Sequence, residues 1–381
     1  MATSYVHGIR TIEDNTGTRP SAPKSTEIIG LVGTAPDADA TLFPLGEPVL
    51  FTNIYSAINN VGATGTLLAN LEEIHNQVLP RLVIVRVAEG ADDAETRANA
   101  VAGITLLETA DSRLGVTPKI LTAGFLDDDL AVANALASAA QKLNGFAYAT
   151  ASGATLSEAV LYRDNFAQRE IELLWPNPMG LDTATGAIVE KPAAALAAGM
   201  RAKIDAEQGW HHPISNLPVN GVVALSHDVS WSLTDSSNDA AVLNEAQITT
   251  FASRGGFRLW GLRTCASDPL FAFETTVRSG QAIREIIADT LSAFMDKPMN
   301  VQLIRDIIAT INAELRRRTA VGHLVGGRAW YEIEANEPSQ LKGGKLVIHY
   351  DYTPVPPLED LTLVQKITDK YLTEYAVILS N

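Results

Sequence analysis

Two groups of neighbouring histidine and aspartate side chains stand out as candidates to ligate a metal ion or transfer a proton. His211 and His212 are adjacent, and His227-Asp228 follows soon after them. Metal-binding histidines on a helix are spaced three or four residues apart, whereas adjacent side chains in an extended segment point to opposite faces. The run Asp127-Asp128-Asp129 could hold a hard cation, but it also suits the start of a helix. We therefore predict no metal site and assign the histidines to packing and hydrogen bonding.

The candidate nucleophiles lack the motifs that catalysis requires around them. Gly30-Leu31-Val32-Gly33 follows a strand-like run, but it is neither a G-x-G-x-x-G fingerprint nor a P-loop. Ser152 lies in Ala-Ser-Gly-Ala rather than in G-x-S-x-G. Cys265, the only cysteine, follows an apolar strand and is expected to be a buried, inert thiol. We predict no catalytic residue and no cofactor; an α/β enzyme of unknown reaction stays an alternative.

The composition limits the classes of partner. The 381 residues include 29 Lys and Arg against 44 Asp and Glu, a net charge of -15. Such a surface repels phosphates and anionic lipids, so we expect no direct nucleic-acid contact and no membrane contact. Residues 1–19 carry no apolar signal segment, and no stretch approaches the roughly 18 apolar residues that would cross a bilayer. A single cysteine cannot form an internal disulfide, which is compatible with folding in the cytosol.

Short apolar strands alternate with amphipathic helices from Glu27 to Gln208. This alternation predicts βαβ units, a mostly parallel sheet covered by helices and an α/β fold class. Pro192 suits the first turn of a helix. The predicted strands are Ile28–Gly33, Leu82–Val87, Ile120–Phe125, Phe146–Thr150 and Ile171–Trp175, and the predicted helices are Leu67–Gln77, Asp93–Leu107, Leu130–Leu143, Leu156–Gln168 and Pro192–Gln208.

The pattern changes after residues 209–230, which are rich in proline, glycine and polar residues and are predicted to connect two domains. Beyond them, strands and long helices predict a C-terminal α+β domain. Both long helices place isoleucines on one face, so they are expected to belong to the core. The predicted elements are helix Ala241–Ala252, strands Phe257–Thr264 and Phe271–Val277, helices Gly280–Met295 and Val301–Arg318, and strand Lys345–Tyr352.

Both ends of the chain are strand-like and poorly equipped to fold alone. Tyr5–Ile12 alternates as an edge strand does, and Leu361–Leu379 is rich in β-branched and aromatic residues. A strand lent to the exposed sheet edge of a neighbour forms a directional contact, and a heterologous contact that does not close generates an open helix. We therefore predict extended β-strand arms at both ends.

A cluster of arginines ends the second long helix of this acidic protein. Arg305 and Arg316 are eleven residues apart and project within about 20° of each other, beside the apolar stripe. Arginines at a helix C-terminus complement the helix dipole, which is the simpler interpretation of Arg316-Arg317-Arg318. The alternative interpretation is a docking face for an acidic partner surface.

One stretch of the sequence resembles a known signature. It runs from Leu243-Asn244 through Ile248–Phe251 to Arg254-Gly-Gly-Phe-Arg-Leu-Trp-Gly-Leu-Arg-Thr264. It is similar to the sequence that opens the C-terminal domain of contractile tail sheath proteins from bacteriophages and R-type pyocins. The resemblance extends from about residue 239 to the C-terminus and is weaker over residues 90–235. The signature residues, to which it assigns a structural role, are Leu243, Asn244, Gly256, Trp260, Gly261, Arg263 and Thr264.

The resemblance implies a division of the chain into an N-terminal linking arm (1–24), an α/β sheath domain (25–237) with a variable outer part (about 90–235), a C-terminal sheath domain (238–365) and a C-terminal linking arm (366–381). In the family, the arms join neighbouring subunits through a shared β-sheet. The arm residues assigned in this way are Tyr5, Val6, Gly8, Ile9, Thr11, Ile12, Tyr371, Leu372, Tyr375 and Val377.

The resemblance also implies a function. Subunits of this family polymerise helically around an inner tail tube, next to baseplate and tail terminator proteins, and contract from a metastable extended state to drive the tube through a cell envelope. Assembly in the bacterial host cytoplasm and a place in the tail of a virion or phage-like particle follow. The same part serves a phage or a bacteriocin; a type VI-like sheath, usually split into two chains, is a further alternative. Our candidates for tube docking are Lys297, Arg305, Arg316 and Arg317.

Overall fold

The computed structural model describes residues 25–182, 185–369 and 371–372. Within these residues a sheet of eight strands forms the centre of the larger part of the molecule, with the order β11-β10-β6-β5-β4-β1-β3-β2. The inner strands are parallel, while β2 and β11 pair antiparallel at the two edges. The strands are β1 (Ile29–Thr34), β2 (Pro48–Phe51), β3 (Leu82–Val87), β4 (Ile120–Thr122), β5 (Phe146–Thr150), β6 (Ile171–Leu174), β10 (Ile248–Ser253) and β11 (Phe257–Trp260).

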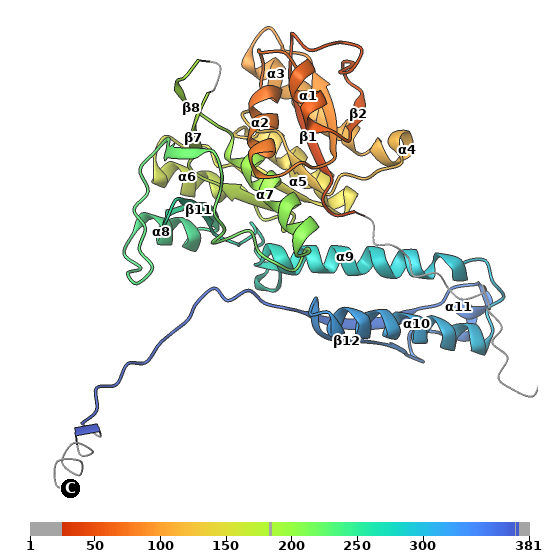
Figure 1. Cartoon of the computed structure of the whole chain (residues 1–381). Coiled ribbons are helices and arrows are strands. Elements are labelled where there is room, and N and C mark those ends of the chain that lie inside the picture. The colour runs from red at the N-terminus through yellow and green to blue at the C-terminus, as the bar shows by residue number, and fades with distance from the viewer. Residues whose placement is uncertain (1–24, 183–184, 370, 373–381) are drawn as a thin grey trace, which may run out of the picture.

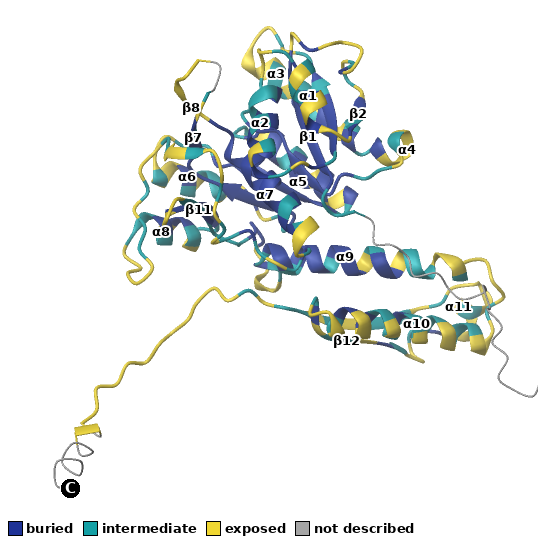
Figure 2. Ribbon diagram, viewed as in Figure 1, coloured by how far each residue is buried: buried dark blue, intermediate teal, exposed yellow. Residues whose placement is uncertain are grey.

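Helices cover both faces of this sheet, and the apolar side chains between the layers form two buried clusters. One layer contains α1 (Ile54–Asn60), α2 (Leu67–Gln77) and α7 (Ala193–Glu207), and the other contains α3 (Asp93–Leu107), α5 (Leu130–Leu143) and α6 (Leu156–Arg163). Because both faces are covered, the central strands are almost continuously apolar, and all six residues of β1 are buried. The expected α/β class is therefore confirmed for this part, which we call the body (Figures 1 and 2).

Helix starts in the body follow the capping rules. The side chain of Asp129 accepts hydrogen bonds from the backbone N–H groups of Ala131 and Val132, so the aspartate run begins α5 as predicted. Asp92 caps α3 in the same way. The predicted bounds of β3, α2, α3 and α5 coincide with the observed ones.

The predicted helix Ala241–Ala252 is wrong in its second half. Helix α8 (Asp239–Glu245) ends early, Gln247 adopts a left-handed backbone with φ of 61°, and β10 begins at Ile248. The segment Ile248–Phe251 carries β-branched and aromatic side chains, and β10 joins the sheet beside β6. In this segment, hydrogen bonding to a neighbouring strand thus determines the structure, although the sequence pattern predicts a helix.

A small antiparallel sheet with the order β8-β7-β9 extends from the body within the described part of the chain. Its strands are β7 (Pro178–Leu181), β8 (Ile188–Glu190) and β9 (Val222–Leu225). The sequence predicts only a connection over 209–230, so β9 is missed. Short helix α4 (Ala110–Leu114) is also missed, because five residues are too few for a visible periodicity.

The predicted strand Phe271–Val277 is also wrong. A 3-10 turn, η1 (Pro269–Phe271), leads into α9 (Glu274–Leu291), which starts six residues before its predicted beginning. Figure 1 shows the long α9 lying below the body and beside α10 (Val301–Ala320). The second half of α9, together with η2 (Ser292–Phe294), α10, β12 (Leu324–Tyr331), α11 (Pro338–Lys342) and β13 (Ile348–Pro354), forms a smaller part that we call the C-terminal unit. Its core includes Ile287, Ile311, Leu315 and Leu324.

Beyond β13 the chain first passes along the body, where Glu359 contacts Arg263, and then continues as an extended segment that runs away from the rest of the molecule (Figure 1). Residues 355–369 contain no strand, so the prediction of a strand from Leu361 is not met in the described part. Tyr371 and Leu372 are both exposed. The other proposed arm residues, namely Tyr5 to Ile12, Tyr375 and Val377, lie outside the described residues, and the domain boundaries stay predictions. None of the helices found in the described residues is long and apolar enough to span a bilayer.

Candidate functional site

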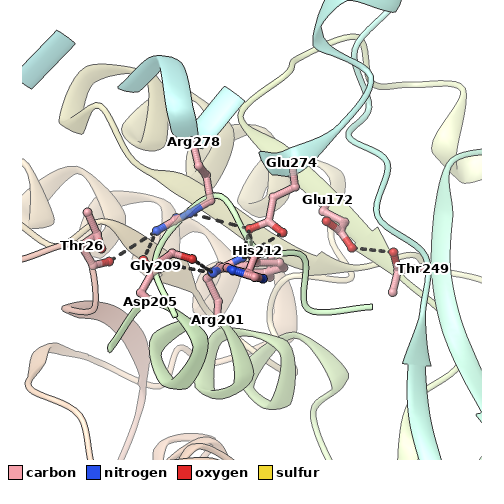
Figure 3. Close-up of polar contacts among 10 residues, drawn as sticks. Thr26, Glu172, Arg201, Asp205, Gly209, His212, Thr249, Glu274 and Arg278 are labelled. Atoms are coloured by element: carbon pink, nitrogen blue, oxygen red, sulfur yellow. Dashed lines mark hydrogen bonds and ion pairs between the residues drawn. The ribbon is translucent and has the colours of Figure 1, made fainter. Parts of the chain in front are cut away.

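A network of buried charges joins α9 to the body (Figure 3). Arg201 and Asp205 come from α7, and Glu274 and Arg278 come from the first turns of α9. Arg201 Nη2 lies 2.7 Å from Asp205 Oδ1, Arg201 Nη1 lies 3.5 Å from Glu274 Oε1, and Arg278 forms an ion pair with Asp205. All four side chains are at most 3% exposed. Two cations therefore face two anions in a site from which water is excluded.

Further hydrogen bonds satisfy most of the network. Arg201 Nη1 donates to the carbonyl of His212 at 2.7 Å, and the phenol of Tyr148 donates to Glu274 Oε1 at 2.5 Å. Burial lowers the pKa of Arg201, but Asp205 and Glu274 outweigh burial and raise that pKa above its ordinary value. Burial and the nearby charge of Glu274 raise the pKa of Glu172 well above its ordinary range. Burial therefore favours the neutral form of Glu172, which adds no charge to the balance of the network.

A second set of polar contacts ties the middle of α9 to the loops that precede β4 and β5. Lys119 Nζ donates to the carbonyl of Leu143 at 2.7 Å and pairs with Glu285 of α9. Gln281 Nε2 donates to the carbonyl of Gly145 at 2.6 Å, and its own carbonyl accepts from Asn144. These partners lie at the amino ends of the parallel strands. Contacts with the body thus extend along α9 from Glu274 to Glu285, and the C-terminal end of the helix carries the C-terminal unit.

Trp210 and three histidines fill the space where α7, α9 and the end of α10 meet. Trp210 packs on two apolar residues of α9, and its ring centroid is 4.7 Å from that of His323. His211 contacts both His212 and His323. The expectation that His211 and His212 point apart is wrong, because the segment forms a turn rather than a strand. Burial, together with His323 and His212, lowers the pKa of His211 to about 4. Among the described residues no group of three or more His, Cys, Asp or Glu could hold a metal ion.

The four residues proposed to dock onto an inner tube are all exposed. Arg305 and Arg316 lie on α10, about 16 Å apart along its axis, and neither forms an ion pair within the described part of the chain. Arg317 lies 3.3 Å from Glu314, and Lys297 lies against the ring of Phe294 in the loop before α10. The docking role of these four residues stays a prediction.

The neighbouring Arg318 differs from these arginines because it is buried. Its guanidinium lies 2.7 Å from Glu314 and 5.5 Å from the ring of Trp210. It therefore packs inside the molecule, between α10 and the turn that follows α7.

Most of the signature residues gather near the start of β10 and the end of β11, which are adjacent in this antiparallel pair, whereas Gly256 lies in the turn between the two strands. Asn244 Nδ2 donates to the carbonyls of Ile248 and Trp260, which fixes the turn between α8 and β10. Gly261 has φ of 146°, and a Cβ there would lie 2.4 Å from Thr249 Oγ1, so only glycine fits. The remaining members are Leu243, which is buried, Gly256, whose φ is 102°, Thr264, which bonds to the carbonyl of Phe271, and Arg263.

Arg263 forms an ion pair with Glu359, which lies 96 residues further along the chain. Sequence reasoning missed this contact because the two residues are so far apart in the chain. Cys265 is buried as predicted, and burial raises the pKa of its thiol to about 12, so the thiol is inert at neutral pH.

Comparison with known proteins relates the whole chain to one family. Residues 99–265 match the model for the phage tail sheath protein central domain, and residues 266–368 match the phage tail sheath C-terminal domain. The chain is 46% identical to the tail sheath protein of Escherichia phage P2, with 97% of both chains covered. It is 38% identical to the major tail sheath protein of Serratia phage KSP20, again over 97% of both.

Two solved structures share the fold. The contracted helical sheath of the anti-feeding prophage has a TM-score of 0.73 at 19% identity and covers 97% of this chain and 100% of its own. The contracted sheath complex of the extracellular contractile injection system PVC has a TM-score of 0.71 at 16% identity, with the same coverage.

Proposed function

The chain belongs to the phage tail sheath family, and from this membership we propose that it polymerises helically around an inner tube and shortens from an extended, metastable lattice. It is a structural component of the tail of a phage or phage-like particle. Contraction would drive the tube through a target envelope without nucleotide hydrolysis, in the manner of other switches that release stored strain. Baseplate and tail terminator proteins would bind the ends of the polymer, which would assemble in the host cytoplasm.

The observation that carries the proposal is the exposed apolar character of the segment after β13. Leu361, Leu363 and Ile367 are 66%, 81% and 93% exposed. In an extended chain these odd-numbered residues share one face, and Thr362 lies on the other. A single chain that exposes such a row of large apolar side chains offers a site for association. This segment therefore has the properties of a strand that is completed by another subunit.

The C-terminal unit offers a matching acceptor. Within the described residues, β12 and β13 pair only with each other, so each strand keeps one unpaired edge. A groove of about 570 Å³ lies between the end of α9, α10 and β13. A strand added beside β13 would form backbone hydrogen bonds and place alternate side chains in this groove, as in other cases of β-augmentation. The groove is lined by Ile287, Leu291, Leu303, Ile307, Ile348 and other residues.

A second copy of this chain is the partner that fits both surfaces. The donated segment and the accepting groove are different surfaces, so each copy gives one segment and receives another, and this contact generates an open helix when the rotation between copies does not close. Lys297, Arg305, Arg316 and Arg317 would hold the inner tube through exposed charge pairs. Such pairs are each worth at most ~1 kcal/mol, so they can be broken one by one and still add up over many subunits.

The test is to compare Leu363→Asp with Thr362→Asp, which adds the same charge to the opposite face of the segment. Negative-stain electron microscopy of the purified chain should show tubes for the wild type and for Thr362→Asp. For Leu363→Asp it should show only small particles with an unchanged melting temperature. Tubes of normal length from Leu363→Asp would overturn the assignment of this face.

A further inference from the structure

The C-terminal segment does not leave the molecule where β13 ends. From Pro354 the chain returns to the body, where Glu359 forms a two-point ion pair with Arg263. Arg263 Nε lies 2.6 Å from Glu359 Oε1, and Arg263 Nη2 lies 2.5 Å from Glu359 Oε2. In this geometry the planar guanidinium faces the carboxylate with two parallel bonds, which fixes the relative orientation of the two groups as well as their distance. Among the described ion pairs it is also the last one along the chain.

The surroundings of this pair are preformed by the body. The guanidinium of Arg263 lies 5.5 Å from the centre of the Phe273 ring, and the two residues are also bridged through their backbones. Pro357, Leu358 and Glu359 cover a cavity of about 270 Å³ whose other walls include Asn244, Trp260 and Gly261. Four of the seven signature residues, Arg263 among them, thus meet at the point that holds the root of the C-terminal segment.

The chain between β13 and Glu359 is stiff, whereas the chain beyond is exposed. Pro354, Pro356 and Pro357 each fix their backbone φ angle, which limits the directions open to this stretch. Beyond Glu359, the large apolar side chains from Leu361 to Ile367 are at least 66% exposed. Glu359 therefore marks the boundary between the proline-rich segment, whose backbone is restricted, and the exposed segment that follows it.

We propose that Arg263 is the positioning residue for the C-terminal arm, and that its pair with Glu359 is a latch that sets the length and direction of the arm. This inference rests on the proposed function, in which residues beyond 360 dock on a second copy. With the latch closed, one residue separates the anchor from Leu361. With the latch open, residues 355–359 are released as well, and their contour length is about 17 Å.

The exposure of the pair makes the latch breakable. The side chains of Arg263 and Glu359 are 36% and 35% exposed, so water and salt weaken their attraction. A pair of this kind favours the closed over the open state about fivefold, which corresponds to ~1 kcal/mol. A closed latch directs the arm toward one neighbour during assembly. An open latch supplies slack when neighbouring bodies move apart, so the docked strand stays in place.

The experiment compares Glu359→Arg with Asp360→Arg, which makes the same change of charge at the adjacent residue. Light scattering should show tube growth slowed about fivefold for Glu359→Arg and unchanged for Asp360→Arg. The exchanged pair Arg263→Glu with Glu359→Arg should restore growth to within about twofold of the wild type. The melting temperature of the unpolymerised chain should stay the same for Glu359→Arg, because a latch acts on the arm and not on the core.

The outcomes separate the latch from the function on which it rests. If a chain that ends at residue 360 still forms tubes, the docking of the arm itself is wrong. If this truncation stops assembly but Glu359→Arg grows tubes at the wild-type rate, the latch is wrong and docking stands. A lowered melting temperature that the exchanged pair does not restore would assign Arg263 and Glu359 to structure alone.

Discussion

The buried network between α7 and α9 allows a quantitative test by Glu274→Gln. Glutamine has the shape of glutamate and can still accept the hydrogen bond from Tyr148, so the substitution creates no cavity. It leaves two arginines, Arg201 and Arg278, facing the single carboxylate of Asp205. Breaking a buried ion pair by removing one partner costs about 3–5 kcal/mol, since a charge is left without compensation. We expect the free energy of unfolding to fall by this amount.

The neighbouring Glu172 adds a pH dependence to this prediction. Its pKa is raised by burial and then by the charge of Glu274, which the substitution removes. In Glu274→Gln, Glu172 should therefore ionise more easily and partly replace the missing charge opposite Arg201. The loss of stability should be smaller at pH 8 than at pH 5. In the double variant Glu172→Gln with Glu274→Gln, this difference should disappear.

The assay is urea denaturation of the dilute, unpolymerised chain, followed by circular dichroism at both pH values. Glu207→Gln is a matched control, because it removes a carboxylate from an exposed position on the same helix, α7. A loss of less than 1 kcal/mol for Glu274→Gln at both pH values would refute the reasoning. It would mean that water reaches the network or that the arginines find other partners.

Two further predictions concern a buried carboxylate and the cationic face of α10. Burial and the charge of Asp128 raise the pKa of Asp127 to about 7, so folding favours its protonated form and the resulting stability is lost as pH rises from about 4 through about 7. Asp127→Asn should therefore raise the melting temperature at pH 8 and leave it unchanged at pH 4. The free energy of unfolding that ionisation of Asp127 removes, and that the substitution would restore at pH 8, is ~4 kcal/mol. Equal effects at both pH values would contradict this prediction. Arg316→Glu with Arg317→Glu should reduce co-sedimentation with the purified tube protein more than self-assembly into tubes, and equal losses would exclude the docking role.

The elements of the body that could be predicted from the sequence are those in which apolar residues follow a clear pattern. Helices α2, α3 and α5 are recognisable because their apolar residues recur at the spacing that places them on one buried face. Strand β3 is recognisable because it is a short, continuous apolar run, as expected for a strand covered on both sides. The segment Ile248–Phe251 was not, because its assignment to β10 depends on pairing with β6, which lies 70 residues or more away in the chain. Sequence periodicity carries no information about such a partner.

The sequence gives only weak evidence of the buried charge network between α7 and α9. Arg201 and Asp205 are four residues apart in an alanine-rich helix, and Glu274 and Arg278 have the same spacing. This spacing is common on exposed helix faces, where it adds little stability, so it does not indicate burial. The pair of Arg263 and Glu359 left no signal at all, because it depends on the return of the chain from β13 to the body.

The distribution of burial decides which contacts can persist while a sheath changes its lattice. The ion pairs that hold the start of α9 are excluded from water, so separating them would leave unpaired charges and cost several kcal/mol each. The latch at Glu359 and the arginines on the outer face of α10 are partly or fully exposed, and each contributes ~1 kcal/mol or less. A load applied through the arms would therefore open the exposed contacts first. The body and α9 would then move as one rigid piece, and the motion would be confined to the proposed arms and to the surface proposed to hold the tube.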